Sequence, residues 1–287
     1  MSIVNLSTTK NILREFNIKP KKKLGQHFLV DANVLKKILD IAKISKDDNV
    51  LEIGGGIGTL TEVLLRKAKK VICVEYDVRL VSVLKEIFKE LDNFVIIQAD
   101  ALKYDLNPMI KKYSINKMVS NPPYNIASTL IFNMLDKYPR IKSYIVMVQA
   151  EIADRFVAKP RDKNYTAISI KMSFISKIKP HFRVSKHVFL PVPEVNSKVL
   201  EIHRRKFSYR GIDRDKLFKL INISFKYRRK KLVNSILLSR DWNLNKIQTE
   251  EIIKKITGNK NVRAEELNSE DFIKLYRNIQ EKIPIWE

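Results

Sequence analysis

Four short stretches of the sequence carry residues that can bind and activate a small molecule. The first, EIGGGIGT (52–59), holds four of the chain's seven glycines directly after an apolar segment. Such a cluster is typical of a tight strand-to-helix turn whose backbone approaches a ligand closely. Glu75 and the pair Asp100-Ala101 each end a later apolar segment. A carboxylate at such a position can accept hydrogen bonds from ribose hydroxyls or from an adenine amine, although Asp100 alone is equally typical of a turn.

The fourth stretch is Ser120-Asn121-Pro122-Pro123-Tyr124, which follows the apolar pair Met118-Val119. Two adjacent prolines fix φ and donate no hydrogen bond, so they form a rigid corner. An aromatic amine is a poor nucleophile because its lone pair is delocalised into the ring. The Asn121 carboxamide oxygen and the Pro122 carbonyl can each accept one of its hydrogens and direct the lone pair at an electrophile. Tyr124 can stack on the base, a contact worth about 1–3 kcal/mol.

These stretches are expected at the carboxyl ends of successive parallel strands. From Asp31, which can N-cap a helix, short β-branched segments alternate with helical patterns of 10–15 residues. That alternation predicts a parallel, doubly wound sheet, which binds its ligands at the carboxyl ends of its strands. The predicted parallel strands are 49–54, 71–77, 93–100, 117–121 and 143–149. Two further strands, 171–178 and 197–204, are predicted without intervening helices, at an antiparallel edge.

The composition changes after His203. Residues 204–231 contain twelve Lys or Arg against two Asp, and the rest of the chain has helical patterns. We therefore predict three parts: a basic N-terminal arm (1–23) that is flexible when nothing is bound, a catalytic domain (24–206) and a helical, RNA-binding C-terminal domain (207–287).

The net charge of +24 and the pI of about 9.9 indicate a polyanionic partner. As that partner, nucleic acid is favoured over an anionic membrane surface. A general richness in lysine is the alternative explanation for part of the charge. The one cysteine, Cys73, lies between Ile and Val, which favours a buried strand position in a reducing compartment. The N-terminus lacks the apolar core of a signal peptide, the apolar runs are too short to span a bilayer, and the four histidines are scattered. These features predict a cytoplasmic protein without a metal site.

The motifs also resemble those of a known family. The glycine turn fits E-x-G-x-G-x-G, the first motif of S-adenosylmethionine-dependent methyltransferases, better than the dinucleotide fingerprint, in which Thr59 would replace the third glycine. Asn-Pro-Pro-Tyr resembles the signature of amino-methyltransferases. Over about residues 20–280 the chain resembles the small-subunit (16S) ribosomal RNA adenine N6,N6-dimethyltransferases. Stretches that carry the resemblance include KKLGQHFLVD (22–31), VQAEIADRF (148–156), FLPVPEVNSKV (189–199), SFKYRRKKLVNSI (224–236) and RAEELNSEDFIKL (263–275).

The resemblance implies an α/β, Rossmann-like class I S-adenosylmethionine methyltransferase sheet with a small all-helical C-terminal domain. It implies dimethylation of the exocyclic amines of two adjacent adenosines in the 3′-terminal hairpin of small-subunit rRNA. The implied partner is that rRNA or the immature small ribosomal subunit, with no membrane and a monomeric enzyme. Two positions depart from the family: Pro122 stands where Leu is more common, and Gly55 where Pro is more common.

The resemblance also assigns site residues. Cofactor contacts fall on His27, Leu29, Gly54, Gly56, Glu75, Asp100, Ala101 and Asn121. The catalytic set is Asn121, Pro122 and Tyr124, with Tyr124 and Phe189 expected to face the target base. For His27 and Phe189 simple packing is the alternative. The basic residues expected to contact RNA phosphates, rather than to form only a solvated surface, are Lys21, Lys22, Lys23, Arg204, Arg205, Lys226, Arg228, Arg229, Lys230 and Lys231.

Three other functions remain open. A resistance-type methyltransferase of large-subunit rRNA would share the fold and the Asn-Pro-Pro-Tyr tetrad, but GQHFL and the arginine-rich FKYRRKKLVNSI favour the small-subunit enzyme. A ribosome-assembly or transcription factor that has lost catalysis is disfavoured by the intact motifs. A DNA adenine methyltransferase has only Pro122 in its favour.

Overall fold

The computed structural model describes residues 3–239 and 244–282. The chain divides into two compact units. The first comprises Met1–Ala153 and Lys177–Arg204, and the second comprises Asp154–Ser176 and Arg205–Glu287. Within the described ranges, no helix combines the length and the apolar character needed to cross a membrane.

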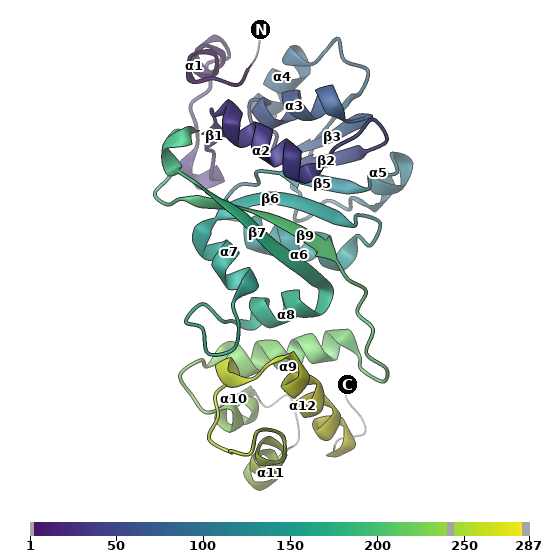
Figure 1. Ribbon diagram of the computed structural model, residues 1–287, viewed down its shortest axis with the longest axis vertical. Coiled ribbons are helices and arrows are strands. Elements are labelled where there is room, and N and C mark those ends of the chain that lie inside the picture. Colours follow the sequence, from purple (N-terminus) through teal and green to yellow (C-terminus); the bar gives the residue numbers. More distant parts are fainter. Residues whose placement is uncertain (1–2, 240–243, 283–287) are drawn as a thin grey trace. The chain divides into compact units, whose positions relative to one another are not determined.

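A seven-stranded sheet forms the centre of the first unit, with the strand order β4-β3-β2-β5-β6-β9-β7 (Figure 1). Its strands are β2 (Asn49–Ile53), β3 (Lys70–Glu75), β4 (Phe94–Gln98), β5 (Lys117–Ser120), β6 (Ser143–Gln149), β7 (Ser176–Val184) and β9 (Ser197–Arg204). Strands β2 to β6 pair in parallel, and β9 pairs antiparallel with β6. The predicted α/β sheet is therefore confirmed. The carboxyl ends of its parallel strands lie side by side at one end of the sheet.

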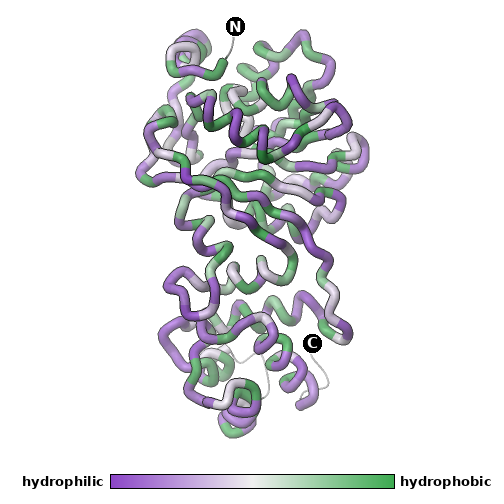
Figure 2. Tube along the Cα trace, viewed as in Figure 1, coloured by the Kyte–Doolittle hydropathy of each residue, from purple (hydrophilic) through white to green (hydrophobic). Residues whose placement is uncertain are grey.

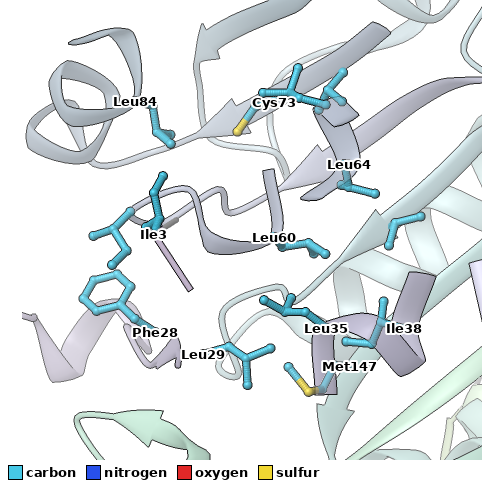
Figure 3. Packing of buried hydrophobic residues seen from close by; sticks show 14 of the residues in the cluster. Ile3, Phe28, Leu29, Leu35, Ile38, Leu60, Leu64, Cys73, Leu84 and Met147 are labelled. Carbon is cyan, nitrogen blue, oxygen red and sulfur yellow. The ribbon is translucent and has the colours of Figure 1, made fainter. Parts of the chain in front are cut away.

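Helices cover the sheet and bury its apolar side chains. They are α1 (Leu6–Glu15), α2 (Ala32–Ala42), α3 (Thr59–Lys67), α4 (Val78–Ile87), α5 (Asn107–Lys112) and α6 (Ala127–Lys137). As predicted, Asp31 caps α2, because its side chain accepts a hydrogen bond from Val34 N at 2.9 Å. Figure 3 shows Leu29, Leu35 and Met147 pointing toward one another in the core cluster of this unit.

The stretch expected to be a flexible arm contains helix α1. Ile3 and Ile12 are buried in the core cluster, and Ile3 N donates a hydrogen bond to the Glu62 carboxylate at 2.8 Å. Spaced isoleucines supply an apolar face, and burying that face stabilises a short helix that would not be stable alone.

A second, two-stranded sheet joins distant parts of the chain. Strand β1 (Phe28–Leu29) pairs antiparallel with β8 (Phe189–Leu190), with Phe28 opposite Leu190. Short 3₁₀ turns, η1 (Lys22–Leu24) and η2 (Lys186–Val188), precede the two strands. The GQHFL stretch therefore lies beside FLPVPEVNS, about 160 residues later in the chain.

The strand predicted at 171–178 is wrong over its first half. Helix α8 (Ala167–Ile175) occupies that half, and β7 begins only at Ser176. A capping box between Thr166 and Ser169 starts the helix, and its apolar side chains are buried on several sides. A short apolar run of that kind has no period that distinguishes a helix from a buried strand.

The second unit is helical. After α7 (Ala150–Val157), which begins in the first unit, and α8, it contains α9 (Arg214–Lys226), α10 (Leu232–Ser239), α11 (Lys246–Thr257), η3 (Ala264–Glu266) and α12 (Ser269–Lys282). The helices predicted after residue 204 are therefore confirmed. Along these helices hydrophobic and hydrophilic residues alternate in bands (Figure 2), as expected for amphipathic helices around a small core. Phe225 and Phe272 stack in that core, with ring centroids 6.2 Å apart.

Candidate active site

A cavity of about 250 Å³ opens at the carboxyl ends of β2, β3, β4 and β5, within the first unit. Residues 24–29 form one of its walls. Ten of the residues expected to bind cofactor or to act in catalysis line it: His27, Leu29, Gly54, Gly56, Glu75, Asp100, Ala101, Asn121, Pro122 and Tyr124. The fold thus brings together residues from five separate stretches of the chain, at the edge where open α/β sheets bind ligands.

The glycine turn packs directly against the proline corner. Gly54 and Gly56 have φ of +80° and +60°, in the left-handed region that favours glycine. A Cβ on Gly54 would lie 3.0 Å from Pro123 Cδ, and one on Gly56 would lie 3.1 Å from the Phe28 ring. Side chains at these two positions would therefore push apart the walls of the cavity.

Gly55 has a different explanation, which accounts for one of the two departures from the family pattern. Its φ is not in the left-handed region, but a Cβ there would lie 2.4 Å from Cys73 Sγ and 3.0 Å from Leu84 Cδ1. Cys73 is fully buried on β3. In this chain the sulfur fills the space that a side chain at position 55 would need, so Gly55 and Cys73 form a matched pair.

Glu75 is held at the end of β3 by backbone amides. Its Oε2 accepts from Gly56 N at 3.1 Å, and its Oε1 accepts from Tyr76 N at 2.8 Å and Asp77 N at 2.9 Å. Burial raises the pKa of Glu75, and these three hydrogen bonds offset the increase only in part. Oε1 therefore uses both of its lone pairs, while Oε2 keeps one for a further donor such as a ribose hydroxyl.

Glu52 is a second carboxyl group in the wall of the cavity, only 1% exposed. Burial raises its pKa to about 8; a hydrogen bond from Thr61 Oγ1 at 2.7 Å opposes this, and the charge of Glu75 adds to it. The group therefore carries a proton at neutral pH.

Asp100 lies half-buried in the turn after β4. Its Oδ1 accepts from Leu102 N at 3.0 Å, and its Oδ2 lies 3.8 Å from Lys103 Nζ. Tyr76, which also lines the cavity, follows Glu75 directly and is 60% exposed. Asp100 and Tyr76 thus add a hydrogen-bond acceptor and an aromatic ring after the ends of two adjacent strands, β4 and β3.

The residue before the Asn-Pro-Pro-Tyr tetrad is anchored, and the first residue of the tetrad carries an open acceptor. Ser120 Oγ donates to Ile53 O at 2.6 Å, which fixes the end of β5 against the glycine turn. Asn121 Oδ1 is buried but accepts no hydrogen bond within the described part of the chain. An unsatisfied buried acceptor costs about 1–3 kcal/mol, and this oxygen has the capacity to accept a hydrogen bond from a molecule in the cavity.

Tyr124 is fixed by three neighbours. Its hydroxyl lies 2.6 Å from Ser197 Oγ, His27 stacks on its ring at 5.4 Å, and the Phe189 ring meets it edge to face at 6.4 Å. His27 Nδ1 is in turn 2.8 Å from Pro191 O. Phe189 is 2% exposed and does not line the cavity, so it supports Tyr124 rather than offering its own face.

Gln26 is a site residue that the sequence did not single out. Its Nε2 donates to Asp77 Oδ2 at 2.9 Å, and its Oε1 accepts from Lys21 N at 2.7 Å. Hydrogen bonds from the Arg79 side chain, with a further one from Gln26, lower the pKa of Asp77 to about 2. This network fastens the N-terminal wall of the cavity to the end of β3.

Glu52 and Tyr76 were also missed as separate groups. In the sequence Glu52 is only the first residue of the glycine motif, whereas an aromatic residue directly after the strand-end acid is a signal that could have indicated Tyr76. Gln26 gives no such signal, because Asp77, which its side chain contacts, lies 51 residues away in the chain.

The basic residues are distributed over both units. Lys21 and Lys23 are exposed beside the N-terminal wall, while the side chain of Lys22 lies outside the described part of the structure. Arg204 Nε donates to Leu135 O at 2.8 Å in the first unit. The second unit holds Arg205, Lys226, Arg228, Arg229, Lys230 and Lys231, all exposed. Some of these are partly engaged: Arg228 contacts Glu265 at 3.4 Å and Lys231 contacts Asn261 at 2.7 Å.

Fold and cavity together define a class I methyltransferase: a seven-stranded sheet in which β9 pairs antiparallel with β6, a glycine turn, strand-end acids and an Asn-Pro-Pro-Tyr corner. Comparison with known proteins agrees. A crystal structure of a dimethyladenosine transferase from Plasmodium falciparum superposes with a TM-score of 0.75 at 28% identity, covering 89% of this chain and 98% of that one. The 23S rRNA methyltransferase ErmE shares the fold, with a TM-score of 0.64 at 22% identity and coverage of 88% and 99%.

The family can be named more closely. The model of the family "Ribosomal RNA adenine dimethylase" matches residues 17–281. The ribosomal RNA small subunit methyltransferase A of Clostridioides difficile (strain 630) is 36% identical over 282 residues, 96% of each chain. This chain belongs to the ribosomal RNA adenine dimethylase family, and the resemblance noted from its sequence is confirmed.

Proposed function

We propose that this enzyme uses S-adenosylmethionine to dimethylate the exocyclic amines of two adjacent adenosines in the 3′-terminal hairpin of small-subunit rRNA. One observation carries the proposal: among the described residues, none donates a hydrogen bond to the buried Asn121 Oδ1, which lies in the wall of a cavity that also holds a glycine turn and two strand-end acids. Membership in the family and the names of its curated relatives support the choice of substrate.

The residues present fit S-adenosylmethionine. Glu75 would accept from the ribose through the free lone pair of Oε2, and Asp100 would accept from the adenine amine while the Ala101 backbone borders the ring. Gly54 and Gly56 would leave room for the amino-acid part of the cofactor, and Leu29 and His27 would line the cavity from the N-terminal wall. When bound, the cofactor supplies an electrophilic methyl group on a sulfonium centre.

The tetrad would prepare the amine of the target base. Asn121 Oδ1 and the Pro122 carbonyl would each accept one of its hydrogens, which draws the nitrogen toward a tetrahedral geometry and orients its lone pair. Preorganised acceptors of this kind stabilise charge that develops in the transition state, here positive charge on the nitrogen. Tyr124, with one ring face against His27, would hold the purine on its other face. No general base is assigned, because the methylated ammonium is acidic enough to release its proton to water.

The rRNA would be held through its phosphates. Lys21, Lys22, Lys23, Arg204, Arg205, Lys226, Arg228, Arg229, Lys230 and Lys231 are the proposed contacts, and such contacts position a strand without reading its sequence. The target adenosines must be unstacked, at a cost of a few kcal/mol, before they reach the cavity. We place the reaction in the cytoplasm, on the rRNA of an immature small subunit, with one copy of the enzyme at work.

The test is mass spectrometry of small subunits that lack adenosine methylation. Subunits incubated with the protein and isotope-labelled S-adenosylmethionine should gain two labelled methyl groups on each of two adjacent adenosines. Label in large-subunit rRNA or in DNA, or no label in any nucleic acid, would overturn the proposal. The Asn121→Ala variant is the matched control, since it should bind the cofactor without transferring the methyl group.

A further inference from the structure

Strand β7 carries a row of basic side chains that none of the assignments above uses. Its sequence is SKIKPHFRV, with basic residues at every second position: Lys177, Lys179, His181 and Arg183. Lys177, Lys179 and Arg183 are exposed, and His181 is half-buried. Strand β7 is an edge strand of the sheet (Figure 1). Alternate residues of a strand face the same side at about 6.6 Å spacing, so these four side chains form one row.

The charge of this row is not cancelled by acids on the strand. Strand β7 contains no Asp or Glu, and the neighbouring strand β9 contains one, Glu201. Glu201 is already engaged, because its two oxygens lie 2.8 Å from His181 Nε2 and 2.9 Å from His203 Nε2. Burial alone would raise the pKa of Glu201, but the hydrogen bonds from the two histidines outweigh it and lower that pKa.

The row also leads toward the cavity. After β7, Ser185 caps the turn η2, which runs into β8. Lys186 N donates to Asn196 Oδ1 at 2.9 Å, which ties this connection to the loop before Ser197, the partner of Tyr124. The β7 end of the row is therefore joined by a short, hydrogen-bonded connection to the residues that support the base-binding ring.

Lysines on an edge strand often serve another purpose, which is to prevent the edge from pairing with a second sheet. The opposite edge of the same sheet provides an internal comparison. That strand, β4 (FVIIQ), carries no charged residue at all. The sheet therefore has one edge strand without any charged side chain. Protection against edge pairing thus does not by itself explain why β7 carries a regular basic row that includes Arg183.

We propose that Lys177, Lys179 and Arg183, here named the β7 row, bind successive phosphates of the rRNA strand that leads to the target adenosine. The inference rests on the proposed function, of which it specifies one RNA-contacting surface. The regular spacing suits a backbone with a regular repeat of charge, and the exposed, flexible side chains suit contacts that position the strand without reading bases.

The test compares two triple variants with equal loss of charge. K177Q/K179Q/R183Q removes the β7 row, and K36Q/K67Q/K85Q removes exposed lysines from α2, α3 and α4 of the same unit. The probe is a synthetic RNA hairpin with two adjacent adenosines in its loop and single-stranded tails. Each phosphate contact contributes about 0.7 to the slope of log affinity against log salt, so losing three lowers the slope by about 2. The same relation gives a loss of about 100-fold in affinity at 0.1 M salt.

The expected result is this loss in the β7 variant and a loss of less than about threefold in the control. Equal losses in both variants, or an unchanged slope in the β7 variant, would refute the inference. Cofactor affinity and methylation of saturating RNA are measured in parallel: wild-type protein that binds RNA but methylates nothing would overturn the proposed function and not the β7 row. If the β7 variant does not fold, acetylation of the wild-type protein with and without RNA tests the same inference. Bound RNA should protect Lys177 and Lys179 and leave Lys36 and Lys85 reactive.

Discussion

Replacing Glu52 by glutamine is expected to remove a pH dependence of stability from the first unit. Glu52 is buried, and its pKa is raised from 4.5 to about 8. Between these values the folded protein keeps a proton that the unfolded chain has released. The free energy of unfolding therefore falls as the pH rises, by about 1.4 kcal/mol per pH unit, and the loss is complete above the folded pKa.

Between pH 6 and pH 7.5 the wild-type protein should lose about 2 kcal/mol more than Glu52→Gln. Glutamine cannot ionise, but its carbonyl oxygen can still accept the hydrogen bond from Thr61 Oγ1. The variant should thus become the more stable protein toward alkaline pH. Glu90→Gln, at an exposed position on the same unit, is the control and should follow the wild type.

The chain offers a reporter for this measurement. Cys73 is its only cysteine and is fully buried beside the glycine turn, so a thiol reagent reacts with it only after the first unit opens. Brief labelling across a urea series at each pH, read by mass spectrometry, gives the unfolding free energy of this unit without interference from the helical one. If the unfolding free energies of the wild type and Glu52→Gln differed by the same amount at every pH, Glu52 would not be the buried neutral carboxyl described above.

Three further outcomes are expected. Asn121→Ala should slow methyl transfer by at least about 100-fold, because it removes a preorganised hydrogen-bond acceptor. Isothermal titration should give a cofactor Kd within about twofold of wild type. Undiminished turnover would show that Asn121 is not catalytic. Glu75→Ala should weaken S-adenosylmethionine binding by about 1.5–3 kcal/mol, and equal affinity would place the cofactor elsewhere. Gly55→Ala should destabilise the first unit by about 1–3 kcal/mol through overpacking. In a Cys73→Ala background most of that cost should disappear. Thermal unfolding of the wild type, the two single variants and the double variant is the test, and strictly additive changes in stability would contradict the matched pair.

Much of the fold follows from local pattern. The parallel strands β2, β3, β5 and β6 were predicted because a doubly wound sheet buries its strands on both faces, which leaves continuous β-branched runs in the sequence. Helix α8 was missed because its apolar residues are buried on several sides and show no helical period. Helix α1 was missed because it depends on burial of Ile3 and Ile12, a contact that only the folded core supplies.

For the site, the sequence alone determined which chemical groups are available and that they end neighbouring strands. Gly54, Glu75, Asp100 and Asn121 all line the cavity, because the carboxyl ends of parallel strands must meet at one edge. Only the tertiary structure decided what surrounds each group. Burial makes Glu52 a neutral acid, the Cys73 sulfur requires glycine at position 55, and pairing of β1 with β8 brings His27 onto the Tyr124 ring. Desolvation, close packing and contacts between distant segments depend on positions in space, which spacing along the chain does not encode.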